Sequence, residues 1–186
     1  MNKTKMSNRG RQDVGEEERE KGNNNPLYKA FLDEVADMYN AEQQLIKVLP
    51  RLAKAAQSDE LRQAFESHLQ ETEQQARRIE EAFEAMGETN HRKKCKGMEG
   101  LLAEGKEMID EYQDGPGIDA VLIAQAQKVE HYEIASYGTI CAWAEQLDQT
   151  EALELLRENL AEEKAADEKL TEIAENVANN QAEGQG

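Results

Sequence analysis

The stretch Ala126-Gln127-Lys128-Val129-Glu130-His131-Tyr132-Glu133-Ile134 decides the fold class of this chain. It lies in a segment, about 119–146, whose apolar residues recur every three or four positions, as on one face of a helix. Glu130 falls on that apolar stripe, between Ile123 and Ile134. A carboxylate that faces a core is unfavourable unless it is paired, protonated or bound to a metal. The segment therefore predicts a long helix with an unusual acid on its buried face.

Three further segments repeat this arrangement, each with one acidic residue on its apolar stripe. They are 26–57 with Glu42, 58–87 with Glu71, and 150–178 with Glu163. Short turns join the first two helices and the last two, and a longer crossover, 87–117, with a weaker helix near 98–112, connects the pairs. The pattern predicts an all-α, ferritin-like antiparallel four-helix bundle of two helical hairpins, with an additional short helix in the crossover.

Composition sets the domain organisation. Residues 1–25 have almost no large apolar side chains and are predicted to be a disordered tail, as are residues 179–186. The helical bundle, 26–178, is one domain of ordinary size.

The same composition excludes several classes of function. The net charge of -17 argues against nucleic-acid binding, which needs clustered Lys and Arg. No apolar run is long enough to span a membrane, and the polar first residues lead us to expect no secretory signal. Cys95 and Cys141 do not form a metal-binding motif, so we expect a cytoplasmic protein with two free thiols.

The four acids predict a dimetal-carboxylate site, because the two hairpins bring them to similar heights in the bundle. Ferritin-like centres use a Glu from each of two helices and a Glu-x-x-His motif from each of the other two. Glu42 and Glu130 would fill the single positions, and Glu71 and Glu163 the paired ones. The histidines are missing, since Gln74 and Ala166 stand three residues later.

Other ligands and donors lie on the same helix faces. The candidate substitutes for the missing histidines are His68, Gln75, Glu133 and Asp167. Tyr39 and Tyr137 are expected to donate their hydroxyl groups to metal-binding carboxylates. Such an oxygen-rich site would take iron, with manganese or another divalent cation as the alternative. Any one of these acids could instead lie at the edge of its stripe and pair with a lysine such as Lys47 or Lys128, and periodicity leaves Glu133 undecided.

Several strings of the sequence resemble the YciF/YciE-like stress proteins of the ferritin-like superfamily. They are Ala41-Glu42-Gln43-Gln44-Leu45, Phe65-Glu66-Ser67-His68-Leu69, Lys94-Cys95-Lys96, the 126–134 stretch, and Glu162-Glu163-Lys164-Ala165-Ala166-Asp167. The resemblance covers about residues 27–175. It implies a bacterial, cytoplasmic helical bundle that forms a homodimer and takes part in stress responses.

Two functions remain open at this point. The first is a dimetal protein that handles iron or peroxide, with an oxidase or peroxidase type of activity at a di-iron centre. The second is a non-catalytic structural stress protein, a homodimer with a vestigial or redox-inert metal site. The matched carboxylates favour a metal, and the missing histidines favour the second alternative.

Overall fold

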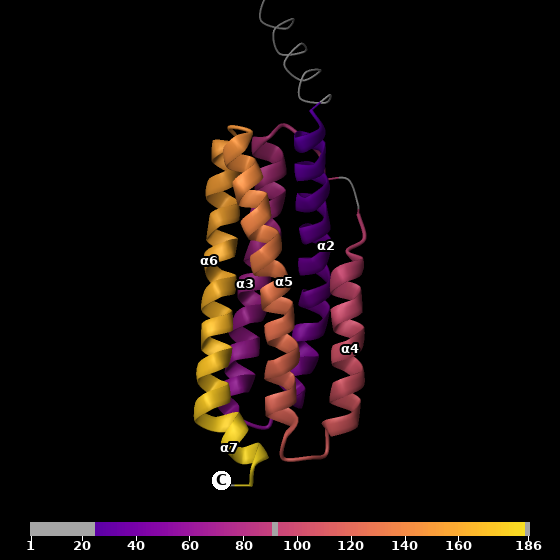
Figure 1. Cartoon of the computed structure of the whole chain (residues 1–186), viewed down its shortest axis with the longest axis vertical. Helices are drawn as coiled ribbons and strands as arrows, with labels where there is room; N and C mark the ends of the chain where they lie inside the picture. Colours follow the sequence, from indigo (N-terminus) through magenta and orange to yellow (C-terminus); the bar gives the residue numbers. More distant parts are fainter. Residues whose placement is uncertain (1–24, 91–92, 185–186) are drawn as a thin grey trace, which may run out of the picture.

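The computed structural model describes residues 25–90 and 93–184, which contain helices and no strands. The first hairpin is α2, Pro26–Ala55, with α3, Asp59–Ala85, and the second is α5, Ile118–Gln146, with α6, Thr150–Ile173. The crossover contains α4, Lys96–Tyr112. Figure 1 shows the four long helices side by side with α4 outside them. The predicted fold class, a ferritin-like four-helix bundle with a fifth helix in the crossover, is confirmed.

Residues with the usual capping chemistry define the ends of the first hairpin. The side chain of Asn25 accepts hydrogen bonds from the first turn of α2, and Pro26 occupies the first helical position. Ser58 Oγ accepts from the Leu61 N–H at the start of α3. Gly87 follows α3 with a φ of 68°, a conformation that glycine adopts without strain.

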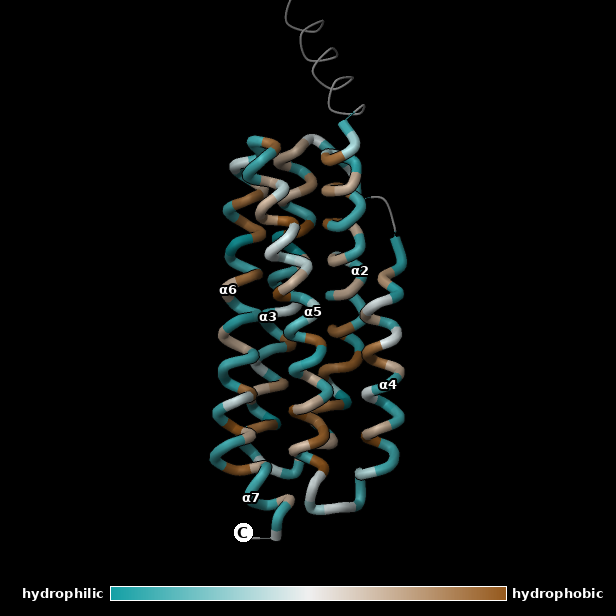
Figure 2. The backbone as a smooth tube through the Cα atoms, in the orientation of Figure 1, coloured by the Kyte–Doolittle hydropathy of each residue, from teal (hydrophilic) through white to brown (hydrophobic). Residues whose placement is uncertain are grey.

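The four long helices form a square. α2 packs against α3 and α5, and α6 packs against the same two helices. The α2–α5 side and the α3–α6 side are therefore opposite faces of the bundle, and α4 lies against α5 and α2 on the first of them. Figure 2 shows hydrophobic and hydrophilic positions alternating along each helix, as expected for helices that bury one stripe.

The two predicted tails differ in how far the structure describes them. The amino-terminal tail, 1–25, lies outside the described residues except for Asn25. At the other end, α6 continues into a π-helix, Ala174–Ala178, and then into α7, Asn179–Ala182. Residues 179–182, which the sequence places in a disordered tail, are thus helical here. None of the described helices has the length and apolar character needed to cross a membrane.

The start of α5 is tied to the turn between α2 and α3 by one buried acid. Asp119 is 1% exposed, and its two carboxylate oxygens accept from the backbone N–H groups of Gln57 at 2.7 Å and Ser58 at 2.8 Å. Each of its two oxygens thus accepts a hydrogen bond from the fold itself. Asp119 joins the two hairpins at one end of the bundle.

The crossover is tied to the bundle at the start of α4. The Cys95 N–H donates to Asn40 Oδ1 at 2.8 Å, and Gln44 Nε2 donates to the Cys95 carbonyl at 3.0 Å. Cys95 Sγ lies 3.1 Å from the hydroxyl of Tyr132 on α5. Gly97 permits this close approach, because a Cβ there would lie 2.7 Å from the Tyr132 ring. These hydrogen bonds fix the position of the start of α4 on the bundle.

Candidate metal centre

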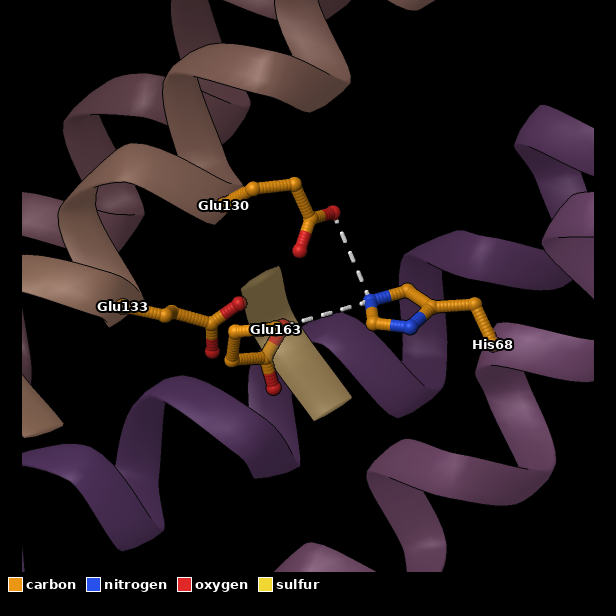
Figure 3. Close-up of side chains that lie close together, drawn as sticks. All are labelled: His68, Glu130, Glu133 and Glu163. Carbon is orange, nitrogen blue, oxygen red and sulfur yellow. Dashed lines mark ion pairs between the residues drawn. The ribbon is translucent and has the colours of Figure 1, made fainter. Parts of the chain in front are cut away.

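Four buried side chains converge in the middle of the bundle. His68 comes from α3, Glu130 and Glu133 from α5, and Glu163 from α6, and one potential ligand atom from each lies within 4.8 Å of all the others. Figure 3 shows the imidazole and the three carboxyl groups pointing toward a common centre. A single metal ion could contact all four. We refer to these residues as the mid-bundle cluster.

The imidazole of His68 has one nitrogen inside the cluster and one outside it. Nε2 lies 3.4 Å from Glu130 Oε1 and 3.9 Å from Glu163 Oε2 (Figure 3). Nδ1 lies 3.4 Å from Oε2 of Glu71, and the Glu71 side chain is 43% exposed. A metal-ligating histidine commonly has such a carboxylate behind it, which sets the ring orientation. Nε2 is therefore the nitrogen presented to a cation.

The carboxylate oxygens of the cluster have almost no hydrogen-bond donors. Among the described residues, both oxygens of Glu133, both of Glu163 and Oε2 of Glu130 are buried without a hydrogen-bond partner. Nearly all buried polar atoms in folded proteins are hydrogen-bonded, so such a concentration needs an explanation. Oxygen ligands with one imidazole suit iron or manganese. The donor set of this site fits a divalent cation.

Two further buried polar side chains come from α2 and α3. Glu42 on α2 is fully buried, with one oxygen bonded to the Tyr137 hydroxyl and the other without a partner in the described chain. Gln75 on α3 is also fully buried, and neither polar atom of its side-chain amide makes a hydrogen bond within those residues. These two side chains could help to hold a second cation, as in a dimetal centre.

A hydrogen-bonded chain connects Glu42 to the surface. The Tyr137 hydroxyl, which donates to Glu42, accepts from Asn159 Nδ2 at 3.0 Å. Asn159 Oδ1 accepts from Arg78 at 3.0 Å, and Arg78 makes two hydrogen bonds of 2.7 Å to Glu162. Each member fixes the next, so the hydroxyl of Tyr137 is held toward Glu42.

Burial governs the protonation of these acids. Burial, followed by the charges of neighbouring acids, raises the pKa of Glu133 well above its ordinary value, and burial likewise raises that of Glu42 and Glu163. Burial also raises the pKa of Glu130, to about 7. For His68, burial acts to lower the pKa, but Glu71 and Glu163 outweigh it and the net pKa is raised. Burial therefore favours the protonated form of these acids in the absence of a metal, and a cation would displace such protons on binding.

A cavity of about 510 Å³ leads to the cluster from the α3–α6 side, and His68 and Glu130 are among its lining residues. Lys169 and Glu60, which also line this cavity, form an ion pair of 3.2 Å between the two helices. We call this the α3–α6 cavity. It gives small polar molecules a route toward the cluster.

Six of the eight predicted ligands are buried, and four of these form the mid-bundle cluster. The buried ones are Glu42, His68, Gln75, Glu130, Glu133 and Glu163. Glu71 is not among them, because the buried face of α3 passes through His68, Thr72 and Gln75, and Glu71 lies at its edge. Glu71 therefore contacts His68 and does not reach into the cluster.

Asp167 also lies outside the cluster. Its carboxylate accepts from Gln127 Nε2 at 3.1 Å and pairs with His131 at 3.4 Å. Of the two predicted tyrosine donors, Tyr137 bonds to Glu42, as the sequence predicts. The Tyr39 hydroxyl donates to Glu80, an exposed acid of α3.

Sequence reasoning missed Asn159 and Arg78. Asn159 is fully buried, and its position three residues after Leu156 and four before Glu163 places it on the same stripe of α6. That spacing could have identified it. Arg78 gives no comparable signal, because an arginine next to a buried stripe is common on a helix surface.

Comparison with known proteins identifies the family of this chain. A model of the family described as a domain of unknown function, DUF892, matches residues 27–183. Protein YciF of Escherichia coli is 48% identical over 154 residues, which cover 82% of this chain and 93% of that protein.

Solved structures show the same fold. The crystal structure of the Escherichia coli stress protein YciF aligns with a TM-score of 0.78 at 47% identity, covering 82% of this chain and 97% of that one. YcfI from Rhodopseudomonas palustris, for which a structural role has been suggested, aligns with a TM-score of 0.77 at 40% identity, covering 79% and 94%.

Proposed function

The chain belongs to the DUF892 family, and on that premise we propose that it is a ferritin-like dimetal-carboxylate protein of the bacterial stress response that handles iron or peroxide. The role in stress is carried over from the related stress protein YciF. The metal is proposed from the residues of the mid-bundle cluster. Iron is the first candidate, and manganese or another divalent cation is the alternative.

The proposal rests mainly on the burial of Glu133 and Glu163 and on the lack of hydrogen-bond donors to their carboxylates. Both are 0% exposed, and none of their four oxygens has a hydrogen-bond partner in the described residues. An isolated carboxylate in a low-dielectric interior is strongly unfavourable unless it is protonated or meets a cation. These two acids and Glu130, grouped with the His68 nitrogen that faces them, would supply both the charge and the ligand atoms for a cation.

The side chains have separate roles in this proposal. His68, Glu130, Glu133 and Glu163 would hold one cation, and Glu42 and Gln75 would extend the site to a second. A bound iron pair would supply redox chemistry and an open coordination position. Glu71 orients His68 through Nδ1, and the chain from Arg78 to Tyr137 orients Glu42. The α3–α6 cavity would give small polar molecules access to the site.

Metal content per chain, measured together with oxygen uptake after aerobic loading with ferrous iron and desalting, tests the proposal. We expect about two iron atoms per chain with oxygen consumed, and loss of both in Glu130→Ala/Glu163→Ala. Glu168→Ala, an exposed acid on the same helix, is the matched control and should retain the iron. Unchanged iron in the double variant would contradict the proposal.

Two observations favour an alternative function, that of a non-catalytic structural stress protein. Gln74 and Ala166 stand where Glu-x-x-His motifs would have histidines, and a structural role has been suggested for the relative YcfI. In this alternative the raised pKa values keep the buried acids protonated, and the protein acts without redox chemistry. It predicts no oxygen uptake and a melting temperature that a chelator leaves unchanged.

The proposal also includes the oligomeric state and the cellular location of the protein. Its resemblance to the YciF/YciE-like proteins implies a cytoplasmic homodimer. Light scattering of the full chain at several concentrations tests the first point, and a mass of one chain throughout would exclude the dimer. Cell fractionation tests the second.

A further inference from the structure

A second cavity lies on the opposite side of the bundle, between α4 and the α2–α5 face. It has a volume of about 270 Å³ and mainly apolar walls, which include Leu49, Leu52, Leu101, Leu102, Ile109 and Val129. Leu52, Leu101, Leu102 and Ile109 are only partly buried. We call this the crossover pocket. Its lining favours an apolar ligand.

The two ends of the crossover pocket differ in charge and exposure. Glu130, which is 2% exposed, also lines the pocket and marks its inner end. Arg51 and Lys106 lie at the exposed mouth. Lys106 pairs with Asp110 at 2.7 Å, whereas Arg51 has no ion-pair partner among the residues that the structure describes. The mouth thus offers one uncommitted cation on a chain of net charge -17.

Gly105 on α4 leaves room in the crossover pocket. It is buried and lines the pocket, yet a Cβ at this position would meet only Gln125, at 3.6 and 3.8 Å, which is ordinary contact. Packing therefore does not require a glycine here, and glycine inside a helix is less stable than alanine. The absence of a side chain at Gly105 keeps part of the crossover pocket open.

We propose that the crossover pocket binds a medium-chain fatty-acid anion, with the carboxylate at Arg51 and the hydrocarbon chain lying along Leu102 and Val129 toward Glu130. The apolar walls suit methylene groups, and Arg51 gives a carboxylate a charged partner. The pocket volume, slightly below that of sites for drug-sized ligands, suits a chain of moderate length. This binding goes beyond the proposed metal function and requires no metal.

Titration calorimetry of the metal-free full chain with octanoate tests the inference. We expect one saturable site per chain. Gly105→Leu should fill the pocket and weaken binding at least tenfold, and Gly105→Ala should weaken it a few-fold with little risk to folding. Gly100→Leu is the matched control, because it lies on α4 outside the pocket and its Cβ would meet nothing within 4 Å. It should bind octanoate as the unchanged chain does.

Arg51 is tested with a pair of ligands. Arg51→Gln should weaken octanoate binding and leave octanol binding unchanged, because only the former carries a charge. Absence of a saturable site, or equal affinity in the Gly105 and Gly100 variants, would overturn the inference. So would a dimer that Gly105→Leu dissociates without any octanoate binding, since a second copy would then cover this face. Metal content of Gly105→Leu, which should be unchanged, separates this inference from the metal proposal.

Discussion

Asp119 and Glu133 are both buried carboxylates of α5, but the fold treats them in opposite ways. Asp119, near the end of the bundle, accepts backbone hydrogen bonds at 2.7 and 2.8 Å. Glu133, in the middle, has no hydrogen-bond donor for either oxygen in the described residues. Burial alone therefore does not mark a functional acid. The supply of donors separates an acid that holds the fold together from one that is available to a cation.

The largest expected effect follows from adding metal. At a free metal concentration about 1,000 times the Kd, binding should raise the free energy of unfolding by about 4 kcal/mol. Glu133→Gln/Glu163→Gln should lose this increment, and Asp119→Asn should keep it, although its metal-free stability is lower. Urea unfolding with and without a divalent cation, followed by a chelator, measures the difference. If the metal still stabilised Glu133→Gln/Glu163→Gln by the same amount, Glu133 would be no more a metal ligand than Asp119.

The metal-free protein should become less stable as the pH rises from 4.5 to 7. Glu130 has a pKa of about 7 in the folded state against an ordinary value of 4.5, so the folded state binds the proton more tightly. The contribution of this group falls by about 3 kcal/mol across that window. The raised pKa of His68 acts in the same direction, because its stabilisation is lost as it deprotonates.

Urea unfolding of the chelated protein at pH 5 and pH 8 measures this slope. Glu130→Gln should make this slope shallower without abolishing it, because the raised pKa values of His68 and the other buried acids still contribute. Asp119→Asn should leave the slope in place. Stability that instead increases with pH in the chelated protein would show that the buried acids are ionised in the folded state.

Removing the structural acid should have a smaller effect. Asp119→Ala leaves the Gln57 and Ser58 N–H groups without their carboxylate and should cost about 2–3 kcal/mol, as expected for hydrogen bonds to a charged group. Thermal unfolding measures the loss. The metal content should stay unchanged, and a loss of metal would mean that the two regions are coupled.

The smallest expected effect concerns Glu42, whose carboxylate is intermediate between those of Asp119 and Glu133. Glu42 has one oxygen bonded to Tyr137 and one without a partner in the described chain. Tyr137→Phe should cost about 1 kcal/mol and make Glu42 resemble Glu133. Thermal unfolding of the metal-free protein detects the change. Tyr39→Phe, whose hydroxyl bonds to the exposed Glu80, serves as the comparison and should have a lesser effect.

Apolar periodicity was sufficient to predict the fold and part of the site. Glu42, Glu130 and Glu163 were predicted on buried faces because apolar neighbours three and four residues away define those faces. Glu71 was placed wrongly, since it adjoins Thr72, and consecutive helical residues point about 100° apart. Only one of them can lie at the centre of the stripe.

The remaining features depend on distances between helices. Glu133 was left undecided because a position one turn from Glu130 can face the core or its edge, and the packing of α5 against α2 and α6 decides it. The partners of Asp167 come from α5, so no pattern within α6 reveals them. The crossover pocket likewise arises only where α4 lies against two other helices.

The way in which α4 is attached has a consequence for local unfolding. Its only buried residues are Met98 and Gly105, and the hydrogen bonds of Cys95 to Asn40 and Gln44 hold its first turn. Because so little of α4 is buried and none of the mid-bundle cluster lies on it, we expect this helix to open from its far end while the four long helices stay closed. Release of a ligand beneath α4 and release of a metal from the bundle are then limited by two different opening reactions.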